Sequence, residues 1–131
     1  MNQTALQQYR AIGVQSGVTD ASSHQLISML ISGAADRMAA ARGAIERGET
    51  ARKGELIGKA ISIIDGLRAS LDRERGGDIA ANLAALYDYI EQGLVEANLR
   101  SDVARLDEVA SLLGEVREAW NSIPAEMRQA P

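Results

Sequence analysis

Residues 76–90 read Gly-Gly-Asp-Ile-Ala-Ala-Asn-Leu-Ala-Ala-Leu-Tyr-Asp-Tyr-Ile, and this stretch decides the fold. The glycine pair is expected to end one helix, because glycine readily adopts the left-handed conformation that terminates helices. Asp78 can then cap the next helix, since its carboxylate accepts hydrogen bonds from free backbone N–H groups of the first turn. That helix, predicted over residues 78–97, carries its core positions at helical spacing on one stripe: Ile79, Leu83, Leu86, Ile90 and Leu94.

A second helix is predicted upstream, between Ser22 and Gly48. Ser22 and Gln25 form a capping box at its start, and Gly48 is a suitable terminating residue at its end. His24, the single histidine, lies in the first turn, where the positive end of the helix dipole disfavours a protonated ring, and we expect it at the surface. The core stripe of this helix is expected to consist of Ile27, Leu30, Ala34, Met38, Ala41 and Ile45.

Two further long helices and one short one complete the set. The first covers residues 50–73 and is predicted to bury Leu56 or Ile57, Ala60, Ile61, Ile64, Leu67 and Leu71. The second runs through residue 120, is capped by Asp102 or Ser101, and is predicted to bury Val103, Leu106, Val109, Leu113 and Val116. Residues 4–12 form a short amphipathic segment, with Leu6, Tyr9 and Ile12 on one side.

Four long helices with short connections pack as antiparallel neighbours. The predicted fold is therefore all-α, an antiparallel four-helix bundle with a short N-terminal helix. The whole chain of 131 residues is expected to form a single domain, residues 1–131, because it is too short for two typical domains. Both prolines lie beyond residue 120, and residues 121–131 are expected to be a flexible tail.

Composition excludes most enzyme classes. Cysteine is absent, and His24 is the single histidine, so neither thiolate catalysis nor a di-iron bundle site with its two Glu-x-x-His motifs is available. We expect no catalysis, no cofactor and no metal. The net charge of −4 argues against a nucleic-acid partner, and no apolar run is long enough for membrane insertion. The polar N-terminus lacks a signal-peptide pattern, which predicts a cytoplasmic protein.

A binding surface is predicted on the helix of residues 78–97. Helical spacing places Tyr87 and Tyr89 on opposite shoulders of its core stripe, and Tyr89 shares its shoulder with Asn82, Ala85 and Gly93. A shallow surface with small side chains, an aromatic wall and an amide suits an incoming amphipathic helix. The alternative is that both tyrosines only bury their rings at the bundle edge and keep their hydroxyls wet.

The N-terminal segment is a candidate cover for a binding groove. Leu26 and Met29 lie on a different face of their helix from the predicted core stripe, beside Gly33, so we expect either the N-terminal segment or a partner to cover them. A helix as short as the one predicted near Tyr9 is marginal by itself in water. We hypothesise that residues 1–17 form a displaceable segment that occupies part of the groove.

Several ordered motifs resemble one known family. Residues 21–34 read Ala-Ser-Ser-His-Gln-Leu-Ile-Ser-Met-Leu-Ile-Ser-Gly-Ala, close to the family pattern Ala-Ser-Pro-His-Gln-Leu-Ile-x-Met-Leu-Tyr-Asp-Gly-Ala. An N-terminal tyrosine, the segment of residues 59–72, the glycine-pair stretch, Glu-Ala-Asn at residues 96–98 and Arg-Glu-Ala-Trp at residues 117–120 follow the same order. Together they resemble the flagellin-specific export chaperones, the FliS family. Ser23 departs from the family's proline, and Ile31 and Ser32 depart from its Tyr-Asp pair.

The resemblance implies a function and a set of contact residues. A chaperone of this family binds the disordered C-terminal segment of flagellin in the cytoplasm, prevents premature polymerisation and delivers the client to the flagellar type III secretion apparatus. The export gate and other flagellar regulators are further possible partners. The positions expected to contact the client are Tyr9, Leu26, Ile31, Asn82, Tyr89 and Asn98. The alternative is a non-enzymatic helical adaptor, a bundle that self-associates through its acidic helices.

Overall fold

The computed structural model describes residues 20–124 and, for side chains, residues 23–124. This part of the chain forms four helices: α2 (Asp20–Glu46), α3 (Thr50–Ala69), α4 (Arg73–Arg100) and α5 (Val103–Asn121). No strand occurs among the described residues. The short helix expected over residues 4–12 lies outside them.

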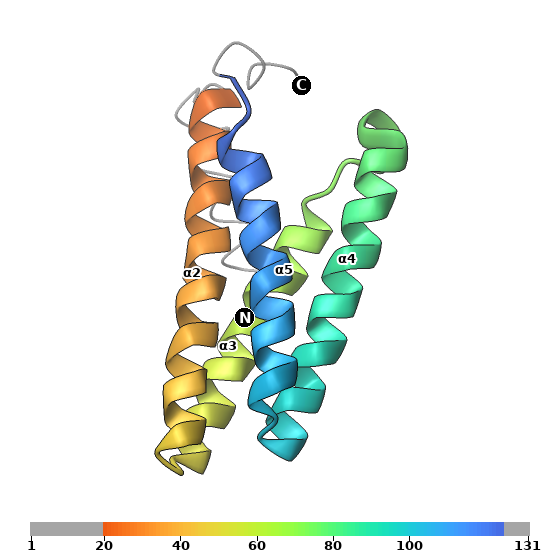
Figure 1. Cartoon of the computed structure of the whole chain (residues 1–131). Coiled ribbons are helices and arrows are strands. Elements are labelled where there is room, and N and C mark those ends of the chain that lie inside the picture. Colours follow the sequence, from red (N-terminus) through yellow and green to blue (C-terminus); the bar gives the residue numbers. More distant parts are fainter. Residues whose placement is uncertain (1–19, 125–131) are drawn as a thin grey trace.

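The helices form an antiparallel bundle in which each helix reverses the direction of the one before it (Figure 1). α2 packs against α3 and α5, and α4 packs against the same two helices, so α2 and α4 lie diagonally opposite each other. The all-α four-helix fold is confirmed. Toward its first residues α4 diverges from α5, while the two helices converge near the turn that joins them (Figure 1).

Two of the predicted helix ends are confirmed. Gly48 adopts a φ of +71°, and the next residue donates its N–H to the carbonyl of Ala44 at 2.8 Å, which closes the end of α2. At the start of α5 the side chain of Asp102 accepts a hydrogen bond from the backbone N–H of Arg105 at 3.0 Å. Ser101, the alternative cap, instead adopts a left-handed φ of 51° and closes the end of α4.

The glycine pair lies between two helical segments, as predicted, but both segments belong to α4 and the preceding long helix ends earlier. α3 ends at Ala69, and α4 begins at Arg73 with Asp72 as its cap, accepting from the N–H of Arg75 at 3.1 Å. The predictions that the preceding helix reaches residue 73 and that Asp78 caps the next one were therefore wrong. Gly77, with φ 51° and ψ −126°, interrupts the helical backbone within α4 and kinks it. Its positive φ explains why glycine stands there.

The α2 start also differs from the predicted boundary. The helix begins at Asp20, before the Ser22–Gln25 pair that was expected to open it. Its buried stripe is rotated as well: Ile31 and Ala44 are fully buried, whereas Ile27, Leu30 and Ile45 only pack partly against the core. Apolar and small residues occur on several faces of α2, so the neighbouring helices decide which face is buried.

The predicted core of α3 and α5 is largely confirmed. The buried apolar residues of these helices are Leu56, Ile57, Ala60, Ile64, Leu67, Leu106, Val109 and Leu113. In α4 the first turns differ: Ile79 is 73% exposed, whereas the buried positions are Ala80, Ala84 and Tyr87. The buried face of this part of α4 is therefore shifted by one residue from the stripe that the periodicity predicts.

His24 and Trp120 join the start of α2 to the end of α5. Their rings stack with centroids 4.5 Å apart. His24 Nε2 donates to the carbonyl of Trp120 at 2.7 Å, and Trp120 Nε1 donates to the carbonyl of His24 at 3.0 Å. His24 is 7% exposed, so the expectation that it lies at the surface was wrong. Its partner is 96 positions away, which local sequence reasoning does not reveal.

Lys53 is a second buried polar residue that periodicity did not predict. It is 6% exposed, and its Nζ donates to the carbonyl of Asn98 at 2.9 Å and to Ser101 Oγ at 2.8 Å. Asn98 belongs to the last turn of α4, where carbonyl groups lack helical partners and the dipole is negative. The ammonium group therefore caps the end of α4 from α3.

Candidate binding surface

The outward side of α4 presents two of the predicted contact residues together. Asn82 and Tyr89 are both exposed, and Tyr89 retains 38% of its accessible surface. They are seven residues apart, which is about two helical turns and places them on the same side of the helix. Ala85 lies exposed between them. We call Asn82, Ala85 and Tyr89 the α4 face.

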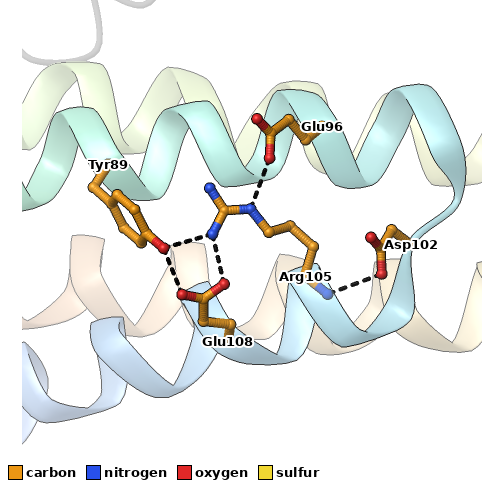
Figure 2. Close-up of polar contacts among 5 residues, drawn as sticks. All are labelled: Tyr89, Glu96, Asp102, Arg105 and Glu108. Carbon is orange, nitrogen blue, oxygen red and sulfur yellow. Dashed lines mark hydrogen bonds and ion pairs between the residues drawn. The ribbon is translucent and has the colours of Figure 1, made fainter.

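Arg105 of α5 reaches across to Tyr89 and two carboxylates (Figure 2). Its Nε donates to Glu96 Oε1 at 2.8 Å, and its Nη1 donates to the Tyr89 hydroxyl at 2.7 Å and to Glu108 Oε1. The Tyr89 hydroxyl in turn donates to Glu108 Oε2. The guanidinium carbon lies 4.7 Å from the centre of the Tyr89 ring, within the range of a cation–π contact. We call these four residues the Arg105 cluster.

The hydrogen bonds and charges of the Arg105 cluster favour the charged forms of Arg105 and Glu108. Hydrogen bonds from Tyr89 and Arg105 hold the pKa of Glu108 below its usual range. The pKa of Arg105 is raised, first by its hydrogen bond with Tyr89 and then by those with Glu108 and Glu96. At neutral pH Arg105 and Glu108 therefore remain an ion pair.

Gly93 permits this close approach between α4 and α5. A Cβ on Gly93 would lie 2.4 Å from Val109 Cγ1 and 3.3 Å from Arg105 Cζ. The residue is buried, so the prediction that Gly93 shares the exposed shoulder of Tyr89 was wrong. A glycine in the middle of a helix costs stability relative to alanine, and close packing is a frequent reason for it.

Tyr87 does not belong to the surface. Its side chain is 4% exposed within the core, and burial raises its pKa to about 12. The prediction of two tyrosines on opposite shoulders therefore holds for Tyr89 and was wrong for Tyr87. Only Tyr89 is available as an aromatic wall on α4.

The other predicted contact residues are dispersed. Leu26 is half-buried on α2 near Met29, which is 68% exposed, and α2 lies diagonally opposite α4. Ile31 is 1% exposed in the core, where it has no surface to offer a client. Asn98 is half-buried at the far end of α4, with its carbonyl bound to Lys53. Tyr9 lies outside the described residues.

Sequence reasoning did not find Arg105, Glu96 and Glu108. Two signals were present: Arg105 is one of only two basic residues in the acidic segment of residues 102–120, and Gly93 interrupts a good helix-forming sequence. Neither signal names the partner, because Tyr89 and Arg105 lie on different helices.

The described residues form an exposed surface suited to binding a partner and no metal-ligand group. Among the side chains that the structure describes, those of residues 23–124, there is no group of three or more His, Asp or Glu that could hold a metal ion. None of the four helices is long and apolar enough to cross a membrane. What the geometry provides is a helical bundle with an exposed aromatic and amide surface on α4, the arrangement of a helical binding protein.

Comparison with known proteins places the chain in a family. The family model described as flagellar protein FliS matches residues 5–127, and the chain belongs to the FliS family. It is 50% identical over 119 residues to the flagellar secretion chaperone FliSB of Pseudomonas aeruginosa, covering 91% of this chain and 94% of that protein. The Salmonella typhimurium flagellar secretion chaperone FliS is 47% identical over 121 residues, 92% of this chain and 90% of its own length.

More distant relatives carry the same name. The Bacillus subtilis flagellar secretion chaperone FliS is 35% identical over 106 residues, 81% of this chain and 78% of that protein. The protein is thus a non-enzymatic chaperone of flagellar protein export, as the ordered motifs had indicated.

Proposed function

We propose that this chaperone binds the disordered C-terminal segment of flagellin in the cytoplasm, prevents its premature polymerisation and delivers it to the flagellar type III secretion apparatus. The observation that carries the proposal is the exposed α4 face, with Tyr89 held in place, on a bundle of the flagellar secretion chaperone family. An amphipathic client helix can place its apolar anchors against such a surface.

The positions of the contact residues require an extended client. Asn82 and Asn98 are sixteen residues apart on α4, about 24 Å along the helix, and roughly 160° apart around it. Leu26 lies on the diagonal helix. A client that contacts all three must wrap around the bundle, as a disordered segment that folds on binding can do. Ile31, being buried, supports the surface from beneath in this proposal.

The N-terminal segment supplies a regulatory element of the proposal. We propose that residues 1–17, including Tyr9, occupy part of the client groove and are displaced when the client binds. Deleting residues 1–17 is expected to leave the bundle folded and to strengthen client binding, measured by calorimetry and circular dichroism. Unchanged affinity in a folded deletion variant, or unfolding of the bundle, would contradict this.

The test of the proposed function is titration calorimetry with a peptide from the last ~45 residues of the cognate flagellin, a length chosen to span two or more client helices. Circular dichroism of the mixture should show more helix than the sum of the separate components. Tyr89→Ala and Asn82→Ala are expected to weaken binding, whereas Arg52→Ala, on the exposed side of α3, serves as the matched control.

Failure to bind would change the assignment. If the folded protein does not bind the peptide, the protein would be a helical adaptor, and sedimentation would then be expected to show self-association. Delivery to the export gate is tested separately, by comparing pull-down of gate components with the chaperone alone and with the chaperone–peptide complex.

A further inference from the structure

Tyr89 is held by unusually many contacts for a half-exposed surface side chain. Its hydroxyl accepts from Arg105 Nη1 at 2.7 Å and donates to Glu108, while the guanidinium lies against its ring at 4.7 Å. A free tyrosine at a helix surface samples several rotamers, and fixing it on binding has an entropic cost. Here two hydrogen bonds and a cation–π contact hold the ring in one rotamer in the protein without a client.

Arg105 is itself held at its backbone and at its guanidinium group. Its backbone N–H binds the Asp102 cap at 3.0 Å, and its Nε binds Glu96 at 2.8 Å (Figure 2). The absence of a Cβ at Gly93 leaves room for the guanidinium, since an added Cβ would lie 3.3 Å from its Cζ. The Arg105 side chain is 17% exposed, less than the Tyr89 ring against which it lies.

We propose that Arg105 is a positioning residue, which locks the Tyr89 ring in its client-binding orientation before the client arrives. The inference rests on the proposed function and extends it, because it names a residue of α5 that fixes the orientation of the Tyr89 ring. Because the ring is already oriented, the client binds a preformed aromatic surface. The side-chain entropy of Tyr89 is therefore lost when the chaperone folds and not when the client binds. The positioning requires the planar guanidinium group of arginine, because a lysine ammonium cannot hydrogen-bond Glu96, Glu108 and Tyr89 from the same plane.

The test compares two arginines that bridge helices. Arg105→Lys is expected to weaken flagellin-peptide binding about 3- to 10-fold, from the combined effect of a cation–π contact and one immobilised side chain. Arg42→Lys is the matched control, because Arg42 binds Asp107 across the α2–α5 interface at 2.8 Å and has no contact with Tyr89. It is expected to leave the affinity within about twofold, on the general rule for surface ion pairs.

A double-mutant cycle distinguishes positioning from direct contact. If Arg105 acts through Tyr89, Arg105→Lys should have little further effect on peptide affinity in a Tyr89→Ala background. If Arg105→Lys weakens binding by the same factor in both backgrounds, Arg105 contacts the client itself and the proposal is overturned. Unchanged affinity in a folded Arg105→Lys protein would overturn it as well.

A measurement without client tests the inference independently of the proposed function. In ring-labelled protein the Tyr89 signals of the aromatic NMR spectrum should shift and average toward free rotamers in Arg105→Lys, and remain in place in Arg42→Lys. Unmoved Tyr89 signals would refute the positioning role. Failure of the wild-type protein to bind the peptide, with Tyr89 signals that do respond to Arg105→Lys, would refute the flagellin assignment alone.

Discussion

Gly93→Ala provides a direct test of how closely α4 and α5 approach. The added methyl group would lie 2.4 Å from Val109 Cγ1, whereas carbon atoms in contact are normally about 3.5–4.0 Å apart. Either the helices separate by about 1 Å or Val109 leaves its rotamer, and overpacking of this kind costs roughly 1–3 kcal/mol. The better helix propensity of alanine offsets about 0.5–1 kcal/mol of this.

Gly58→Ala on α3 is the matched control. A Cβ at Gly58 has no neighbour within 4 Å, so only the helix propensity changes and the variant should gain about 0.5–1 kcal/mol. Gly93→Ala should lose about 1–2 kcal/mol, and the two melting temperatures should differ by roughly 6–12 °C at about 4 °C per kcal/mol. Urea unfolding followed by circular dichroism gives the free energies. A Gly93→Ala protein as stable as Gly58→Ala would refute the close packing described here.

Three further predictions concern buried polar groups. Lys53→Met should lose about 1–3 kcal/mol in urea unfolding, because it leaves the end of α4 without its charged donor, while Lys59→Met on the exposed side should change stability little. Glu91 has a pKa of about 7, raised from 4.5 by burial and then by the carboxyl of Asp65. Its protonated form is favoured in the folded state, so stability should fall as pH rises from about 4.5 to 7, by on the order of 1 kcal/mol after solvent screening, and Glu91→Gln should flatten this slope. His24→Ala should shift the fluorescence of Trp120, the sole tryptophan, to longer wavelength, because it removes the stacked ring that shields the indole.

Each of these has an outcome that contradicts it. Equal stabilities of the Lys53 and Lys59 variants would mean that the end of α4 is satisfied without Lys53. A wild-type pH profile that matches the Glu91→Gln profile would show that Glu91 titrates as an ordinary carboxyl. Unshifted emission in His24→Ala would show that the α2–α5 contact does not persist in solution.

The exposed part of the candidate surface was predictable because it depends on local geometry. Asn82 and Tyr89 share a face in any straight helix, since they are seven residues apart. The partner of Tyr89 was not predictable, because Arg105 lies on a different helix and the distance between the helices depends on Gly93. Ile31 shows the opposite case: the family motif suggested a surface role, whereas packing buries the side chain.

The sequence by itself determined the four long helices of the described residues, the ends marked by Gly48 and Asp102, and the family, because caps, glycine stops and ordered motifs act within a few residues of one another. The tertiary structure alone decided which face of α2 and of the first turns of α4 is buried. These helices carry alanine, glycine and aliphatic residues on several of their own faces, so the periodicity does not select one buried stripe. The choice comes from the positions of α3 and α5, and the same packing buries His24 and Lys53 against backbone carbonyl groups near the ends of α5 and α4.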